Sequence, residues 1–209
     1  MRKDKLIELA QESLAGGDVS AELRGKYPKP VIELYLDMAY SDVMQEEFEK
    51  AGSDMTIFDN AARPYKVLVD YNKDTEMRFF ALPVQLIPLR PNQAAIRSIS
   101  MYKGQQVAFA PISNSSIPVW NELEAMGIDS TCSYMIEDNN VVLYRNAPQV
   151  GAEIMVKIIT PFSELSDTDN VTVPGGKNEM LFQRMYSFMS LRKNIKTEYN
   201  DNNSDQKLG

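Results

Sequence analysis

The chain has 209 residues, of which 44% are hydrophobic, and a net charge of −7. It contains one cysteine, Cys132, and no histidine. A single cysteine excludes an internal disulfide, and the lack of histidine removes the commonest general base and the commonest metal ligand. We therefore expect a folded protein that is not an enzyme, with no catalytic, cofactor or metal site, in which Cys132 is a small buried hydrophobe.

Hydropathy and charge exclude further classes of protein. No stretch approaches the roughly 18 to 20 apolar residues that a membrane span needs, and the N-terminus has no apolar run of the signal-peptide type. We therefore expect a protein made in a cytoplasm, with no membrane partner. Acidic residues outnumber basic ones before residue 174, and the reverse holds after it. Most of the molecule should therefore repel nucleic acid.

The first 52 residues predict helices. The stretch KDKLIELAQESLAGG indicates a helix that ends at its two glycines, and a short helical piece is expected over residues 19–24. Pro30 is expected to open a longer helix that ends at Gly52. The core face of this helix is predicted to consist of Ile32, Leu36, Ala39 and Val43. Further apolar residues lie beside this core face, so we expect the helix to be buried on more than one side. These residues are Val31, Leu34, Tyr35 and Met38.

Residues 63–163 predict a β block. Short runs rich in β-branched and aromatic residues are broken by Pro, Gly and Asn. The clearest signal is a hairpin in SYMIEDNNVVLY, because residues 138–140 tolerate left-handed backbone angles between two apolar runs. Pro83 and Pro88 indicate edge positions or bulges in the run that contains them.

The sequence PGGK at residues 174–177 raises the question of a phosphate-binding loop. Such a loop needs a longer glycine-rich stretch and a hydroxyl directly after the lysine. Val171 stands where the first glycine should be, and Asn178 follows the lysine. We therefore interpret this stretch as the entry to a C-terminal helix over residues 174–193.

The predicted C-terminal helix has an apolar face rich in methionine. Leu181, Met185, Phe188 and Met189 share that face, and Phe182 lies beside it. A flexible methionine stripe either packs within the subunit or is shared with another subunit. Residues 194–209 are polar and have little to bury, so we expect a tail that is disordered in the free protein and orders on a partner.

Helices at both ends of the sequence flank the β block. This order predicts an α+β fold in which the terminal α-helices pack together, with an inserted antiparallel β-sandwich or barrel-like block and a disordered C-terminal tail. We expect a single domain over residues 1–209. Its parts are the helical part (1–52), the β block (63–163), the C-terminal helix (174–193) and the tail (194–209).

The order of these elements also carries a resemblance to a known family. The stretches VIELYLDMAYSDVM, MIEDNNVVLYRNAP and VPGGKNEMLFQRMYSFM, followed by a polar tail, resemble the head-to-tail connector adaptors of short-tailed, crAss-like bacteriophages. These are ring proteins that lie beneath the portal. The resemblance covers nearly the whole chain in architecture. It implies a virion structural protein of the neck or tail that forms a cyclic ring of about twelve identical subunits.

The resemblance also implies partners and contact residues. The portal protein and other neck or tail ring proteins would be the partners, and DNA would pass through the ring without specific binding, as the acidic charge suits. Residues 194–209 would be the docking arm, with little apolar content. The candidate subunit and portal contacts are Met180, Phe182, Met185, Phe188, Met189, Ile195, Tyr199 and Leu208.

A second hypothesis belongs to a different class of protein. A soluble, monomeric binding or scaffolding module would use the β block to recognise a peptide or a glycan. Its natural platform would be the aromatic residues Trp120, Tyr102 and Tyr144, although such residues lie more often in a core. Self-assembly and presence in a phage particle would distinguish the ring protein from this module.

Overall fold

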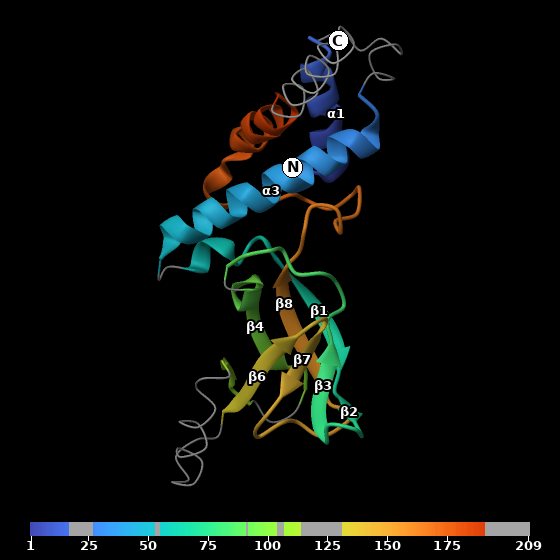
Figure 1. The fold of residues 1–209 in the computed structure, drawn as a ribbon, viewed down its shortest axis with the longest axis vertical. Helices are drawn as coiled ribbons and strands as arrows, with labels where there is room; N and C mark the ends of the chain where they lie inside the picture. Colours follow the sequence, from blue (N-terminus) through green and yellow to red (C-terminus); the bar gives the residue numbers. More distant parts are fainter. Residues whose placement is uncertain (17–26, 53–54, 91, 104–106, 114–130, 191–209) are drawn as a thin grey trace, which may run out of the picture. The chain divides into compact units, whose positions relative to one another are not determined.

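The computed structural model describes residues 1–16, 27–52, 55–90, 92–103, 107–113 and 131–190. The chain divides into two compact units, one formed by Met1–Ile57 with Pro161–Gly209 and the other by Phe58–Thr160. The first, the helical unit, contains helices from both ends of the chain, and the second, the β unit, contains the strands (Figure 1). This arrangement confirms the predicted α+β fold with a β block inserted between terminal helices.

The helical unit begins with α1 (Lys3–Leu14) and α3 (Lys29–Ala51). Pro30 lies in the first turn of α3, where the missing N–H would have had no partner within the helix. The helix ends at Gly52, whose φ of 57° lies in the left-handed region that glycine accepts. The predicted start and end of this helix are therefore confirmed. The helical piece expected over residues 19–24 lies outside the described residues.

The core of the helical unit combines side chains from α1, α3, the helix that includes residues 178–190, and the segment after the β unit. The predicted core face of α3 is completely buried, whereas Leu34 and Met38 are 54% and 45% exposed. The prediction that α3 is buried on more than one side is therefore wrong for these two residues. The buried apolar residues include Leu6, Ile7, Ala10, Ile32, Leu36, Ala39, Val43, Met44, Phe162, Leu165, Val171, Val173, Leu181 and Met185.

The N-terminus is tied by backbone hydrogen bonds to the segment that follows the β unit. The Lys3 N–H donates to the carbonyl of Asp169 at 2.8 Å, and the Val171 N–H donates to the carbonyl of Met1 at 2.7 Å. Residues far apart in the sequence thus form one edge of the helical unit.

The side chain of Lys3 strengthens this edge. It is only 4% exposed, and its ammonium lies 2.7 Å from Glu33 Oε1 on α3. The same ammonium donates to the carbonyls of Leu165, at 2.8 Å, and Ser163, at 3.3 Å. The ring of Phe162 lies 5.2 Å from Nζ. All three protons of the ammonium therefore have acceptors, as a buried charge requires.

The described strands of the β unit form two sheets. The three-stranded sheet has the order β1 (Ala62–Leu68), β8 (Glu153–Ile159), β4 (Ile96–Met101). The five-stranded sheet has the order β2 (Asp70–Asn72), β3 (Met77–Ala81), β7 (Asn140–Leu143), β6 (Cys132–Glu137), β5 (Phe109–Pro111). Neighbouring strands are antiparallel, as predicted, except that β5 pairs with β6 in parallel. Residues 112–131 separate these two strands, more than the dozen or so residues that a parallel crossover needs.

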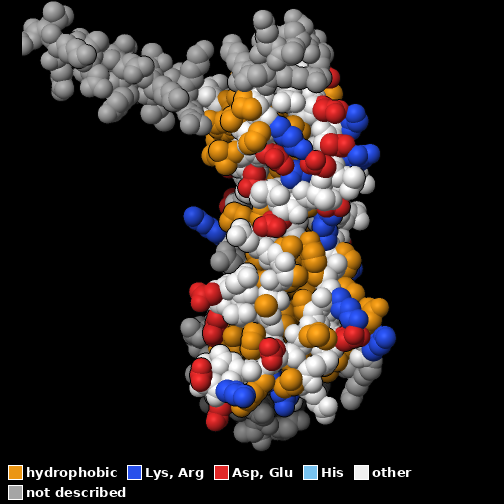
Figure 2. All heavy atoms as spheres, turned by 90° about the vertical axis from the view of Figure 1, so that its right-hand side faces the viewer, with side chains coloured by type: hydrophobic (Ala, Val, Ile, Leu, Met, Phe, Trp, Pro, Cys, Tyr) orange, Lys and Arg blue, Asp and Glu red, His pale blue; other side chains and the backbone are white. Residues whose placement is uncertain are grey.

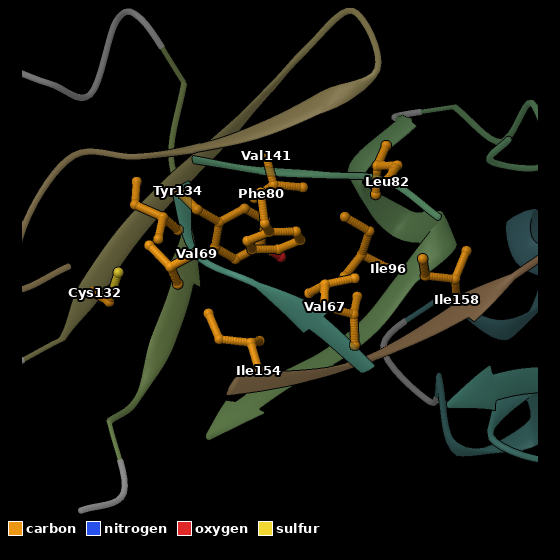
Figure 3. Packing of buried hydrophobic residues seen from close by; sticks show 12 residues of the cluster. Val67, Val69, Phe80, Leu82, Ile96, Cys132, Tyr134, Val141, Ile154 and Ile158 are labelled. Atoms are coloured by element: carbon orange, nitrogen blue, oxygen red, sulfur yellow. The ribbon is translucent and has the colours of Figure 1, made fainter. Parts of the chain in front are cut away.

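Side chains from both sheets meet in one core. Figure 3 shows Phe80 of β3 in the middle of this cluster, with Val69 on one side of it and Ile96 on the other. A core shared by two sheets is the arrangement expected of a sandwich or a barrel-like block. The buried cluster consists of Val67, Val69, Phe80, Leu82, Ile96, Cys132, Tyr134, Val141, Leu143, Ile154, Val156 and Ile158.

The predicted hairpin is the β6–β7 pair. Glu137 pairs with Asn140 across the turn, and Asp138 has a φ of 52°, the left-handed geometry that its short polar side chain tolerates. The run that contains Pro83 and Pro88 is shorter as a strand than the sequence suggested, since β3 ends at Ala81, before both prolines. Proline lacks the N–H that a continued ladder would need.

Candidate functional site

The glycine–lysine stretch forms the entry to the C-terminal helix. A short 3₁₀ turn, η4 (Pro174–Gly176), precedes residues 178–190, and both of its glycines have a φ of 69°. The Lys177 ammonium donates to the two carboxylate oxygens of Glu47 on α3, at 2.8 and 2.7 Å. The lysine that a phosphate loop would use is thus engaged with a carboxylate of the same unit. Its position confirms the interpretation as helix entry.

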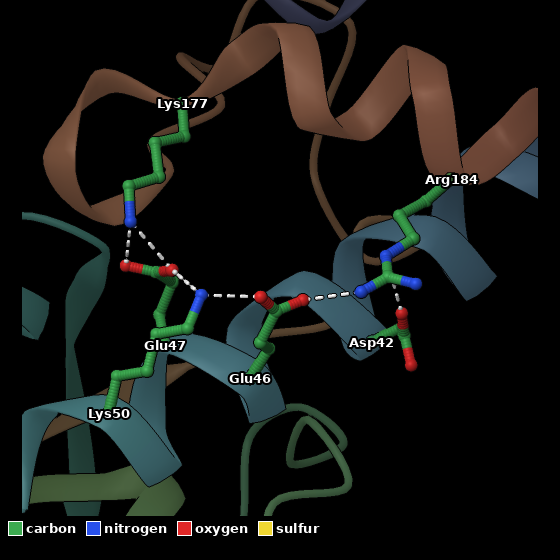
Figure 4. Close-up of polar contacts among 6 residues, drawn as sticks. All are labelled: Asp42, Glu46, Glu47, Lys50, Lys177 and Arg184. Carbon is green, nitrogen blue, oxygen red and sulfur yellow. Dashed lines mark hydrogen bonds and ion pairs between the residues drawn. The ribbon is translucent and has the colours of Figure 1, made fainter.

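An ion-pair network joins α3 to the C-terminal helix (Figure 4). Arg184 Nε lies 3.1 Å from Asp42 Oδ2, and its guanidinium also binds Glu46. Lys50 binds Glu46 and lies 3.3 Å from Glu47. The hydrogen bond from Lys177, and then that from Lys50, hold the pKa of Glu47 below its usual value, against the effect of its burial. The network therefore fixes the C-terminal helix along α3.

The structure places five of the candidate contact residues on the C-terminal helix. Leu181 and Met185 are completely buried in their own unit, so Met185 cannot serve a neighbouring subunit. Ile195, Tyr199 and Leu208 lie outside the described residues. The remaining candidates are half-buried: Met180, Phe182, Phe188 and Met189. Phe182, Tyr186 and Met189 recur at i, i+4 and i+7 and form what we call the C-terminal stripe.

The outer side of α3 carries a second apolar stripe, which the sequence prediction assigned to the core. Val31, Leu34 and Met38 recur at i, i+3 and i+7, and the last two are among the most exposed large apolar side chains of the helical unit. We call these three residues the α3 stripe. On the face shown in Figure 2, hydrophobic side chains gather at the surface of the helical unit beside acidic and basic ones. The signal that could have revealed the stripe is apolar residues on two opposite sides of one helix.

The outer face of the five-stranded sheet contains an open groove with a volume of about 410 Å³. Its floor includes Phe79 and Val142, which lie directly opposite each other on β3 and β7. The Tyr144 hydroxyl donates to Glu137 Oε1 at 2.7 Å. Burial, followed by this hydrogen bond, raises the pKa of Tyr144 to about 12. The lining residues are Asn72, Thr75, Met77, Phe79, Glu137, Asp138, Asn140, Val142 and Tyr144.

The three aromatic residues of the predicted platform do not gather in one place. Tyr144 lines the groove on the five-stranded sheet. Tyr102 follows β4 of the three-stranded sheet, is 44% exposed, and has the Lys66 ammonium 4.6 Å from its ring centroid. Trp120 lies outside the described residues. The sequence prediction thus identified one residue of the groove, Tyr144, and missed the others. It looked for exposed tyrosine and tryptophan, whereas the rest of the lining consists of polar and acidic residues and outward-facing apolar ones.

Cys132 lies in the core of the β unit with no exposed surface. Burial raises the pKa of its thiol to about 12, so the reactive thiolate is not populated at neutral pH. Within the described parts of the chain, no group of three or more His, Cys, Asp or Glu residues could hold a metal ion. In those same parts, no helix is long and apolar enough to cross a membrane.

Comparison with models of known protein families finds no match for this chain, and a search of curated proteins finds no significant match.

Proposed function

We propose that this protein is a virion structural protein that forms a ring in the head-to-tail connector of a short-tailed bacteriophage, below the portal, where the ring serves as a conduit for DNA. The observation that carries the proposal is the presence of two separate apolar stripes on the helical unit. A contact between the α3 stripe of one copy and the C-terminal stripe of the next would join two different surfaces. Such head-to-tail contacts close into rings when the rotation between subunits allows it.

Burial of the exposed residues of the α3 stripe would stabilise this contact between subunits. Complete burial of a leucine or methionine side chain contributes about 1.5–3 kcal/mol. Leu34 and Met38 retain about half of their surface in the free subunit, so each has roughly 1 kcal/mol left to gain on assembly. Every subunit of a closed ring makes this contact on both sides, which favours the ring over open chains.

The charge of the chain also supports a role as a conduit. The net charge of −7 is repeated in each copy, so a ring is strongly acidic. An acidic lining repels phosphate, which allows DNA to move without sticking to the wall.

Quantitative peptide mass spectrometry of purified phage particles tests the proposed function. Particles from the host that produces this chain should contain about twelve copies of it, which is the number of subunits expected for one ring below one portal. Absence of the chain from the particles would overturn the ring and leave the monomeric binding module as the better hypothesis.

A paired substitution tests the proposed contact surface. The double variant L34E/M38E places two carboxylates in the α3 stripe and should shift the protein from rings towards monomers in native mass spectrometry. The matched control is L68E, because Leu68 is 59% exposed and lies in the β unit, which contains neither stripe. Circular dichroism checks that both proteins are folded. Unchanged assembly of folded L34E/M38E would show that the α3 stripe is not the contact.

A further inference from the structure

The groove on the five-stranded sheet has an apolar floor and polar ends. Met77 and Phe79 on β3, with Val142 on β7, are half-buried. Phe79 and Val142 lie next in sequence to the core residues Phe80, Val141 and Leu143, whose side chains point to the other face of the sheet. The groove therefore runs over neighbouring strands on the face opposite the core. Its volume of about 410 Å³ lies within the range typical of small-molecule sites.

One end of the groove supplies hydrogen-bond donors. Asn72 Oδ1 accepts from the backbone N–H groups of Asp74, at 2.9 Å, and Thr75, at 3.4 Å. This turn fixes the side chain of Asn72 and leaves its amide nitrogen, with two N–H donors, for a ligand. The exposed hydroxyl of Thr75 lies in the same turn and both donates and accepts.

The opposite end supplies acceptors. Glu137 already accepts one hydrogen bond from Tyr144, which holds the carboxylate in place and leaves its second oxygen for a ligand. Asp138 adds a second carboxylate, and Asn140, directly opposite Glu137, adds an amide that both donates and accepts.

This distribution of groups selects among ligand classes. The only charged side chains that line the groove among the described residues are Glu137 and Asp138, so phosphates, carboxylates and nucleic acids are repelled. The cationic side chains of a basic peptide only donate hydrogen bonds and would use the carboxylate end alone. The hydroxyls of a sugar donate and accept, so they match both ends, and the C–H faces of the sugar ring match the apolar floor.

We propose that this groove binds a neutral carbohydrate chain. A second hollow, with a volume of about 270 Å³, lies on the other side of the β6–β7 turn and shares Asp138 with the groove. Its lining contains Gln85 and Asn139 together with apolar residues, and no basic side chain among the described residues. The ligand is therefore an oligosaccharide that extends past the turn. This site is independent of the ring, because every residue that lines it belongs to the β unit.

Titration of the full-length, ¹⁵N-labelled protein with a panel of defined saccharides tests the proposal. The neutral probes are the hexasaccharides of α-1,4-glucose, β-1,4-glucose, β-1,4-mannose, β-1,4-xylose and β-1,4-N-acetylglucosamine. At least one should bind with a Kd of about 1 mM or tighter and shift the amide signals of groove residues. Its affinity should not change with salt, since no net charge is paired.

Two substitutions locate the binding in the groove. T75A and N140A each remove hydrogen-bonding groups without touching the core, and each should weaken binding about threefold to tenfold. The matched control is Q149A, because Gln149 is an exposed residue of the β unit that does not line either hollow, and it should bind as the unaltered protein does.

Three outcomes would overturn the proposal. The first is that none of the neutral saccharides binds at about 10 mM, a concentration well above the Kd expected of such a site. The second is that a lysine-rich hexapeptide binds in a salt-sensitive manner while the saccharides do not. The third is that saccharide affinity is unchanged in both T75A and N140A. Isothermal titration calorimetry of the same protein reports binding whether the protein is a ring or a monomer, so failure of the carbohydrate site and failure of the ring are separate results.

Discussion

Replacement of Lys3 by methionine should destabilise the helical unit far more than the same change two residues later. Lys3 is 4% exposed and donates to Glu33 and to two backbone carbonyls, whereas Lys5 is 61% exposed and its ammonium pairs with Glu8, which is 54% exposed. Both lysines belong to α1 and both form one ion pair. The comparison between K3M and K5M therefore isolates the effect of burial.

The size of the effect follows from what each substitution leaves behind. K3M keeps the volume of the side chain but leaves the carbonyl of Leu165 without its buried donor, which costs about 1–3 kcal/mol. Glu33 is 29% exposed and can turn to water, which limits the loss from the broken ion pair. Methionine does not have to be desolvated as an ammonium does, and this gain offsets part of the cost of the lost hydrogen bonds and ion pair. We expect a net loss of about 2–3 kcal/mol for K3M and at most about 0.5 kcal/mol for K5M.

Thermal unfolding followed by circular dichroism at the helical band measures this difference. For a chain of this size, 1 kcal/mol shifts Tm by about 2–4 °C, so K3M should melt roughly 5–10 °C below the unaltered protein. K5M should melt within about 2 °C of it. Equal melting temperatures for the two variants would refute the claim that the buried ammonium holds the N-terminal edge together.

Three further predictions concern other parts of the chain. Because the pKa of Glu47 is lowered in the folded protein, its contribution to stability is complete above the ordinary value of 4.5 and is lost as the pH falls through the folded pKa. K177M should therefore lose less of its free energy of unfolding than the unaltered protein does as the pH falls below 4.5. Urea titrations at several pH values measure this, and the same dependence of the free energy of unfolding on pH in both proteins would contradict it. Cys132 should resist iodoacetamide at pH 8 until the protein is unfolded, as peptide mass spectrometry can show, and rapid labelling of the native protein would contradict its burial. Deletion of residues 194–209 should leave Tm unchanged but weaken binding to the portal in pull-down assays, and a large drop in Tm would show that these residues pack on their own unit.

Local signals in the sequence predicted much of the fold correctly. The core face of α3 followed from its helical period, and the β6–β7 hairpin followed from the residues of its turn. The entry to the C-terminal helix followed from proline and glycine ahead of an apolar period. In each case the deciding interaction lies within a few residues of the signal, so a single sequence contains it.

The features that the sequence did not predict depend on contacts between distant residues. The acceptors of the Lys3 ammonium are Glu33 and the carbonyls of Ser163 and Leu165, all distant in sequence. Nothing near position 3 therefore marks it as buried, and lysine is almost never buried without partners. Leu34 looks like a core residue because a helix with apolar residues all round usually is buried. The groove needs β2, β3, β7 and β6 to be neighbours, an order that differs from their order in the chain.

The α3 stripe and the groove belong to different units, so their proposed roles should be energetically independent. Substitutions at distant sites with no shared partners are usually additive. L34E/M38E should therefore shift the protein from rings towards monomers and leave saccharide affinity unchanged, whereas T75A and N140A should each weaken saccharide binding and leave the oligomer unchanged. A change of saccharide affinity on assembly would contradict this independence and would show that a neighbouring copy takes part in the groove. The unaltered protein, L34E/M38E, T75A and N140A together thus distinguish a ring that displays a carbohydrate site from a site that the ring itself would complete.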